Sequence, residues 1–337
     1  MNGRYSRQER FRGLGALGQK AIRAAEVAIV GVGALGSVLA EIMARAGVGR
    51  LTLVDRDYVE ASNLQRQSLF TEDDAERGLP KAVAAAARLK AINSEVDVRG
   101  LVADFATEGA ETFLKGQSLV LDGTDNFEAR YLLNDVCLRA GIPWVYGACV
   151  GAHGLALLVR PRVSPCLRCV LGEKPSPGSG PTCDTAGVVS PIVHVIAGLQ
   201  AAEGLKVLAG RTEAFLPGLV SVDLWTGAFD VTDLRGRAPW CPACREARYD
   251  YADAPGTSAA VLCGRDAVQL RPQGGPIDLV SLAGRLQAAG DVTANEHLVR
   301  FRAAGAELVV FGDGRAIVKG VRDATEARSV YARYVGI

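Results

Sequence analysis

Residues 27–57 read VAIVGVGALGSVLAEIMARAGVGRLTLVDRD, and this stretch decides the fold. An apolar run, long enough for a buried strand, leads into Gly31, Gly33 and Gly36, which are spaced G-x-G-x-x-G. A helix-forming segment follows, and a second apolar run ends at Asp55. Such glycines permit a tight turn and let a phosphate approach the backbone at the N-terminus of the helix. The pattern predicts a strand, a turn, a helix and a strand that bind a nucleotide.

Asp55 strengthens the interpretation as a nucleotide site. It follows Gly36 by about 20 residues, where an acidic residue meets a ribose hydroxyl in dinucleotide-binding folds. The glycine spacing alone would also suit a turn that only packs a strand against a helix. The strand, the helix and Asp55 at the expected spacing together favour a nucleotide-binding site. Because no Gly-Lys-Ser or Gly-Lys-Thr follows the loop, the sequence excludes a P-loop.

The composition fits a soluble globular protein of about two domains. Apolar residues make up 49% of the 337 residues and charged residues 22%, which suits a sizeable core. A net charge of +1 predicts neither a nucleic-acid partner nor a membrane partner. The charged start, MNGRYSRQERFRG, lacks the apolar segment of a secretion signal, so we expect a cytoplasmic protein. The apolar stretch 188–209 contains enough polar residues to favour a buried helix over a membrane span.

A polar loop follows the second predicted strand, and ligands bind beyond such strand ends in open α/β sheets. The loop offers carboxylate, hydroxyl, amide and guanidinium groups within a short stretch. Its candidates for ribose, base and phosphate contacts are Asp57, Ser62, Asn63, Gln65 and Arg66.

Lys81 follows Pro80 at the start of an expected helix, 81–92. Proline suits the first turn of a helix, whereas a cation is unfavourable beside the positive end of the helix dipole. A phosphate between the lysine and the helix would remove that conflict. We therefore favour a phosphate contact over a surface lysine.

Asp125 lies in DGTDN, residues 122–126, between an expected strand (119–121) and an expected helix (127–140). A carboxylate at this place can cap the helix. Alternatively, it can hold Mg²⁺ together with nucleotide phosphates, since such magnesium sites use one or two carboxylates. Asn126, the next residue, is a further candidate for cofactor binding.

Arg7 belongs to an N-terminal segment with four arginines among its first twelve residues. The segment could be the solvated face of a helix, or an arm that reaches an anion. The spacing does not decide between these two interpretations.

Two C-x-x-C pairs supply four thiolates suited to a closed tetrahedral Zn²⁺ site: Cys166 with Cys169, and Cys241 with Cys244. Redox pairs or two disulfides are the alternatives, but zinc explains both pairs at once. A site closed by four thiolates has no open position for a substrate, so we expect a structural role. Cys183 lies outside this set, on a loop upstream of an expected helix, and is either a nucleophile or an inert thiol.

Strands and helices alternate up to residue 159, which predicts an α/β fold with a Rossmann-like, doubly wound, mostly parallel sheet. We expect a nucleotide-binding domain that includes the cysteine site (1–246), a linker (247–257) and a small α+β module (258–337). The module contains no recognisable catalytic constellation, so its role stays open. We expect it to contain helices at 279–288 and 324–334, and strands at 298–302, 307–311 and 315–319, the last two joined as a hairpin.

Taken in order, the motifs of this chain resemble those of the E1-like adenylating enzymes, the ThiF/MoeB group. The resemblance covers about residues 4–244, and the tail around LCGRD (262–266) is similar to the C-terminal module of a longer branch of that group. The motifs are RYSRQ (4–8), GVGALG (31–36), VDRD (54–57), SNLQRQ (62–67), PK (80–81), TDN (124–126), TCDTAGV (182–188) and the two C-x-x-C pairs.

The resemblance implies ATP-dependent adenylation of the C-terminal Gly-Gly carboxylate of a ubiquitin-like sulfur carrier protein. Thiamine, molybdopterin and related sulfur-transfer pathways use such carriers. In this family Asp55 would hold the ribose, and Asp125 would bind Mg²⁺. The residues that would hold the phosphates are Asn63, Arg66 and Lys81.

The resemblance also implies a homodimer in which Arg7 reaches the ATP of the partner subunit, with helix 192–209 at the interface. Cys183 matches a mobile cysteine that bonds to the carrier in some branches and is dispensable in others. Ala34 replaces a glycine of some relatives without disturbing the loop. Since no rhodanese domain is present, we expect a separate sulfur donor.

Three alternatives remain. An NAD-dependent oxidoreductase would share the glycine loop and Asp55 but would not explain Arg7, Arg66, Lys81 and Asp125. A non-catalytic partner subunit usually loses the arginine arm or the metal-binding acid, and both are present here. A branch that dehydrates a modified tRNA base lacks the full cysteine set and would need a basic surface.

Overall fold

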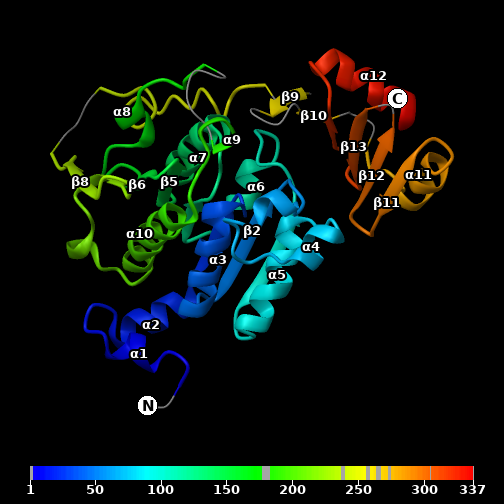
Figure 1. The fold of residues 1–337 in the computed structure, drawn as a ribbon. Coiled ribbons are helices and arrows are strands. Elements are labelled where there is room, and N and C mark those ends of the chain that lie inside the picture. The colour runs from blue at the N-terminus through cyan, green and yellow to red at the C-terminus, as the bar shows by residue number, and fades with distance from the viewer. Residues whose placement is uncertain are drawn as a thin grey trace. The chain divides into compact units, whose positions relative to one another are not determined.

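The computed structural model describes residues 3–176, 183–236, 240–255, 259–262, 267–271, 275–303 and 305–336. The chain divides into two compact units (Figure 1). Unit 1 comprises Met1–Ser176 and Ala186–Ala254, and unit 2 comprises Pro177–Thr185 and Pro255–Ile337. The exact limits of the predicted domains and linker stay predictions.

Unit 1 is built on an eight-stranded sheet in the order β3-β2-β1-β4-β5-β6-β7-β8. The strands from β3 to β5 are parallel, and β6, β7 and β8 continue the sheet antiparallel. The predicted α/β fold with a mostly parallel sheet is therefore confirmed. The strands are β1 (Glu26–Val30), β2 (Arg50–Asp55), β3 (Asp97–Val102), β4 (Leu119–Asp122), β5 (Trp144–Val150), β6 (His153–Val159), β7 (Gly218–Asp223) and β8 (Ala228–Asp233).

The sequence interpretation ended this sheet at residue 159 and missed β7 and β8. β7 buries only alternate residues, and every residue of β8 is exposed. Neither strand therefore has the continuous apolar run that marks a strand buried on both faces.

Helices cover both faces of the sheet of unit 1 (Figure 1). One face packs against α3 (Ala34–Ala46), α5 (Lys81–Ile92) and α10 (Ser190–Leu208). The other face packs against α6 (Ala110–Leu114), α7 (Phe127–Ala140) and α8 (Leu167–Leu171). The remaining helical segments before β7 are α1 (Ser6–Arg10), α2 (Gly15–Ala24), α4 (Glu72–Glu76), α9 (Cys183–Ala186) and the 3-10 turns η1 (Ala61–Asn63) and η2 (Thr212–Ala214).

α10 is the one helix in the described part of the chain that is long and apolar enough to cross a membrane, judged by length and composition. It packs against α3 and against β4, β5 and β6. Ile192, Ile196 and Ala197 on this helix are fully buried in the core of unit 1. The predicted helix is therefore observed, with one side buried in unit 1.

Unit 2 has a six-stranded antiparallel sheet in the order β11-β12-β13-β14-β10-β9, with α11 (Leu279–Leu286) and α12 (Ala324–Tyr334) packed on it. The expected hairpin and closing helix agree with β13, β14 and α12. Residues 263–266 of the LCGRD motif lie outside the described part. The strands are β9 (Ala259–Leu262), β10 (Ala267–Leu270), β11 (Asp291–Ala294), β12 (Leu298–Ala303), β13 (Ala306–Phe311) and β14 (Ala316–Lys319).

Candidate active site

The glycine-rich loop lies where the strand order of the sheet reverses. Val30, the last residue of β1, is in register with Val54 of β2 on one side and with Asp122 of β4 on the other. Ala34 then begins α3, so the free N–H groups of this helix point to the same edge of the sheet. Open α/β sheets bind their ligands at this kind of reversal.

The glycines let two backbone segments approach closely. Gly31 has a φ of 82°, in the left-handed region, and a Cβ on Gly36 would lie 1.9 Å from its carbonyl oxygen. A Cβ on Gly123, which follows β4, would lie 2.3 Å from the same oxygen. Around Gly33 there is more space, since the nearest atom to an added Cβ is Nε2 of Gln67 at 3.8 Å. A phosphate can therefore approach the loop at Gly33.

Asp55, Asp57 and Lys81 form a buried charged cluster beside this loop. The Asp55 carboxylate accepts hydrogen bonds from the backbone N–H groups of Val32, at 2.6 Å, and Asp57, at 2.7 Å. Lys81 Nζ donates to Asp57 Oδ2 at 3.3 Å, and its side chain is only 4% exposed. Burial raises the pKa of Asp55, and the nearby charge of Lys81 opposes that shift. Lys81 is therefore no surface lysine, and the anion that it faces here is Asp57.

The polar loop after β2 places its candidate side chains in different environments. Asn63 is buried, and its side-chain oxygen accepts from the N–H of Glu60, which closes the η1 turn. Arg66 is half-buried and donates to the carbonyl of Ser62 at 3.0 Å. Ser62 and Gln65 are exposed. The structure therefore gives Asn63 a definite structural role and leaves the guanidinium of Arg66 near the surface.

Asp125 lies on the loop between β4 and α7, at the same edge of the sheet as the glycine loop. Asn126, the next residue, is the N-cap of α7, because its side chain accepts from the N–H of Ala129 at 2.9 Å. Asp125 itself is exposed, and its carboxylate accepts from the side-chain amide of Asn126 at 3.3 Å. Helix capping therefore belongs to Asn126, and the carboxylate of Asp125 faces solvent.

Asp122 and Arg130 form a buried ion pair that the sequence analysis missed. Asp122 is fully buried at the end of β4, with Oδ2 3.5 Å from Nε of Arg130. Thr124 donates to Asp122 Oδ1 through both its N–H and its hydroxyl. Burial raises the pKa of Asp122, whereas the guanidinium of Arg130 lowers it. The position of Asp122 at a strand end, like that of Asp55, was a usable signal, but nothing in the spacing indicated Arg130.

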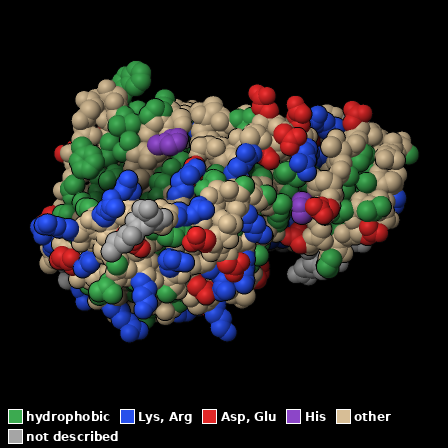
Figure 2. Space-filling model, turned by 90° about the horizontal axis from the view of Figure 1, so that it is seen from below, with side chains coloured by type: hydrophobic (Ala, Val, Ile, Leu, Met, Phe, Trp, Pro, Cys, Tyr) green, Lys and Arg blue, Asp and Glu red, His purple; other side chains and the backbone are tan. Residues whose placement is uncertain are grey.

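Arg7 lies away from these residues within its own unit. It is exposed on α1, and the neighbouring Gln8 donates to the carbonyl of Ala46 at the last residue of α3. Because α3 begins at the glycine loop and extends about 18 Å, α1 lies at the opposite end of that helix. Lys and Arg side chains are spread over the face of unit 1 seen in Figure 2. One copy of the chain therefore does not bring Arg7 to Asp55, Lys81 and Asp125.

The four cysteines of the two C-x-x-C pairs come together. Cys166 and Cys169 lie at the start of α8, and their Sγ atoms are 3.7 Å apart. Cys166 Sγ is also 3.7 Å from that of Cys241, and Cys169 Sγ is 3.4 Å from that of Cys244. All four ligand atoms lie within 4.8 Å of one another, and the thiols are free. A tetrahedral Zn–S₄ site needs sulfur atoms about 3.8 Å apart, so the cluster has the geometry to hold a metal ion.

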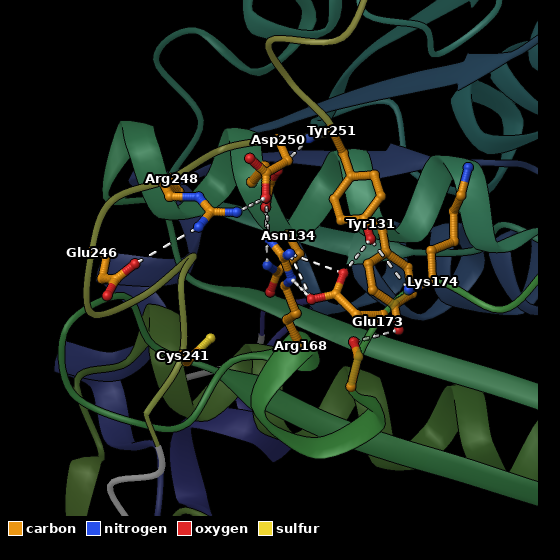
Figure 3. Close-up of polar contacts among 12 residues, drawn as sticks. Tyr131, Asn134, Arg168, Glu173, Lys174, Cys241, Glu246, Arg248, Asp250 and Tyr251 are labelled. Atoms are coloured by element: carbon orange, nitrogen blue, oxygen red, sulfur yellow. Dashed lines mark hydrogen bonds and ion pairs between the residues drawn. The ribbon is translucent and has the colours of Figure 1, made fainter.

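Arg168, between the first two cysteines, anchors chain segments around this cluster (Figure 3). Its guanidinium makes two short hydrogen bonds to Glu173, at 2.7 and 2.9 Å, and one to Asp250 at 2.9 Å. Tyr251, the next residue, donates its hydroxyl to Glu173, and Asp135 of α7 accepts from its N–H. Residues of the predicted linker are thus held against α7 and α8.

Cys183 is the first residue of the four-residue helix α9. Its side chain lies outside the described part of the chain, so its predicted role stays open.

Comparison with known proteins identifies the family of this chain. Residues 5–243 match the ThiF family. The chain is 45% identical to the sulfur carrier protein ThiS adenylyltransferase of Bacillus subtilis (strain 168), over 100% of both chains. It is 39% identical to the sulfur carrier protein adenylyltransferase of Thermus thermophilus, covering 72% of this chain and 90% of that protein.

A solved structure supports the same assignment. The crystal structure of E. coli MccB with ATP aligns with a TM-score of 0.60 and 25% sequence identity, over 72% of this chain and 75% of that chain. This chain has a glycine loop at the strand-order reversal, acidic side chains at the ends of the flanking strands, and a four-cysteine cluster. It is similar over its full length to one named adenylyltransferase. The chain belongs to the ThiF family.

Proposed function

We propose that this enzyme uses ATP to adenylate the C-terminal Gly-Gly carboxylate of a ubiquitin-like sulfur carrier protein. The observation that carries the proposal is the gathering of the glycine loop, the buried Lys81 and the exposed Asp125 at one edge of the sheet. Full-length similarity to a ThiS adenylyltransferase supports the same reaction. This similarity does not favour an NAD-dependent oxidoreductase.

In the proposed reaction, a carboxylate oxygen of the carrier attacks the α-phosphorus of ATP. A new oxygen–phosphorus bond forms, the bond from the α-phosphorus to the bridging oxygen breaks, and pyrophosphate leaves. No side chain becomes covalently attached, so catalysis depends on positioning and charge neutralisation. The carrier ends as an acyl-adenylate, which a separate sulfur donor can attack.

The residues at this edge of the sheet have different proposed roles in binding ATP. Asp55 accepts from the ribose hydroxyls, since its fixed carboxylate keeps unused lone pairs. Asn63, Arg66 and Lys81 hold the phosphates. Because Lys81 is already buried against Asp57, its charge is positioned before the nucleotide arrives.

Asp125 is the proposed Mg²⁺ ligand. Its exposed carboxylate fits a hard cation that takes oxygen ligands from one or two carboxylates and from substrate phosphates. A bound Mg²⁺ would neutralise charge on the phosphates as pyrophosphate departs. In this proposal, Ser62, Gln65 and Asn126 line the nucleotide.

Two further elements complete the proposal. In a homodimer with α10 near the interface, Arg7 would reach the ATP of the partner subunit, which agrees with its distance from the site in its own chain. Zn²⁺ in the four-cysteine cluster would be structural, since four thiolates leave no position for a substrate. Hydrogen bonds from the neighbouring thiols, first Cys166 and then Cys169, lower the pKa of Cys244.

Pyrophosphate exchange into ATP tests the proposal. The purified chain is mixed with ATP, Mg²⁺, labelled pyrophosphate and one candidate carrier that ends in Gly-Gly, for the thiamine or molybdopterin pathway. We expect label in ATP only with a carrier whose terminal carboxylate is free. Asp125→Ala should abolish exchange and leave the fold intact, while hydride transfer to NAD with no exchange would contradict the proposal.

A further inference from the structure

A fully buried glutamine, Gln200, joins β5 to the end of β4, where the loop that carries Asp125 begins. β4 and β5 pair in parallel at two positions, the last being Leu121 with Val145. Gln200 of α10 lies against their ends, and its Nε2 donates to the carbonyl of Asp122 at 2.8 Å and to that of Val145 at 3.0 Å. The side chain therefore bridges the two strands where their own ladder ends.

The backbone of β5 is shaped to accept this amide. Gly147 is buried, and a Cβ at this position would lie 2.3 Å from Cδ and Oε1 of Gln200. Oε1 has no hydrogen-bond partner among the described residues, so the donor end is the part of the amide that the fold uses. An apolar side chain would fill the same space at a smaller cost in stability, because a buried polar atom without a hydrogen-bond partner is destabilising.

Arg130 reaches the same place from the other face of the sheet. α7 packs in the core on the opposite side of the sheet from α10. Nη2 of Arg130 donates to the carbonyls of Thr124, at 2.8 Å, and Gly147, at 3.2 Å, while Nε faces Asp122. The loop is thus held at Asp122 and Thr124, immediately before Asp125.

We propose that Gln200 and Arg130 are positioning residues that clamp the β4–α7 loop from both faces of the sheet and set Asp125 for metal binding. This inference rests on the proposed function through the role of Asp125. Neither residue touches the nucleotide in this scheme. They act on the backbone and side chain of Asp122 and on the backbone of Thr124, so the position of the Asp125 carboxylate depends on them.

Gln200→Met is the informative variant, because methionine keeps the volume and removes both donated hydrogen bonds. Substitutions of residues that orient a metal ligand typically cost about 10- to 100-fold in metal affinity or activity. We therefore expect the Mg²⁺ concentration for half-maximal pyrophosphate exchange to rise about tenfold or more. Ile196→Val, one turn earlier on α10 and packed against β6 near Gly154, is the matched control that should leave this concentration unchanged.

Hydrogen exchange of the loop tests the clamp without any catalytic assay. Mass spectrometry of peptides that cover residues 122–126 should show at least about tenfold faster exchange in Gln200→Met than in Ile196→Val. Equal protection in the two variants would overturn the clamp, whether or not the chain adenylates a carrier. Faster hydrogen exchange of this loop, together with a wild-type Mg²⁺ dependence of pyrophosphate exchange, would overturn the link to Asp125. If the wild type shows no pyrophosphate exchange with any carrier, that result counts against the proposed function, and with it against the metal-positioning role.

Gly147→Ala gives a second route to the same contact, since the added methyl would collide with the Gln200 amide. If both substitutions act through this contact, the double variant with Gln200→Met should be no worse than the more impaired single variant. Additive losses in Mg²⁺ dependence would contradict a shared mechanism.

Discussion

Replacing Lys81 by methionine should make unit 1 sensitive to pH in a defined direction. Methionine keeps the length of the buried stem but removes the ammonium group that lies 3.3 Å from Asp57 Oδ2. The carboxylates of Asp55 and Asp57 then lose the charge of Lys81, which favours their ionised forms. Breaking a fully buried pair costs about 3–5 kcal/mol, but the Asp57 side chain is 15% exposed, so we expect a smaller loss. A loss of about 2–3 kcal/mol at neutral pH follows.

The pH dependence follows from Asp55. Burial raises its folded pKa, and Lys81 opposes that shift, so removing Lys81 raises the folded pKa further. An acid with a raised folded pKa stabilises the fold below its unfolded pKa, about 3.9, and loses that contribution as pH rises through the folded value. The difference between Lys81→Met and the wild type should therefore be small near pH 4 and full at neutral pH.

Urea denaturation followed by tryptophan fluorescence measures this difference. All three tryptophans, Trp144, Trp225 and Trp240, belong to unit 1, so the signal reports on that unit. Lys90→Met, at an exposed position near the end of the same helix, is the control and should change little at any pH. A loss for Lys81→Met that is equal at acidic and neutral pH would refute the charge argument.

The remaining predictions concern the four-cysteine cluster, the hydrogen bonds of Arg168 and the second subunit. Metal analysis should find about one Zn per chain. The Cys166→Ser variant should lose the metal and unfold at a lower temperature. The Cys137→Ala variant, at a buried cysteine outside the cluster, should keep the metal. Arg168→Met removes the bonds to Glu173 and Asp250 and should lower the free energy of unfolding by about 1–2 kcal/mol, whereas Arg235→Met, at an exposed pair with Asp233, should have no measurable effect. Arg7→Ala and Asp125→Ala should each be inactive alone, but an equal mixture should recover about a quarter of wild-type pyrophosphate exchange, because about half of all dimers are then mixed and each mixed dimer carries one intact site of its two; no recovery after verified subunit exchange would contradict catalysis in trans.

The parts of the fold that could be predicted were those with a strong local pattern. The glycine loop, the buried run before Asp55 and the helix after Pro80 each appear where the sequence placed them. β7 and β8 could not be predicted because they are partly or wholly exposed. They are strands because they pair with each other, and the apolar pattern of each segment does not record that pairing. Local periodicity records burial, and these strands have little of it.

The candidate site was only partly predictable for a related reason. Asp55, Lys81 and Asp125 follow strand ends or begin helices, so their positions in the sequence indicate one edge of the sheet. Arg130 and Gln200 lie within helices on opposite faces, and only the packing brings them to Asp122. The close contact between Gly147 and Gln200 likewise joins residues from separate elements, and no spacing in the chain indicates it.

Transfer of a labelled oxygen tests the central claim most directly. A carrier with heavy oxygen in its terminal Gly-Gly carboxylate is incubated with the enzyme, ATP and Mg²⁺, and the acyl-adenylate is then cleaved by a thiol. If the carboxylate attacks the α-phosphorus, mass spectrometry will find one labelled oxygen in the released AMP and none in pyrophosphate. AMP without label, or label in pyrophosphate, would contradict the account.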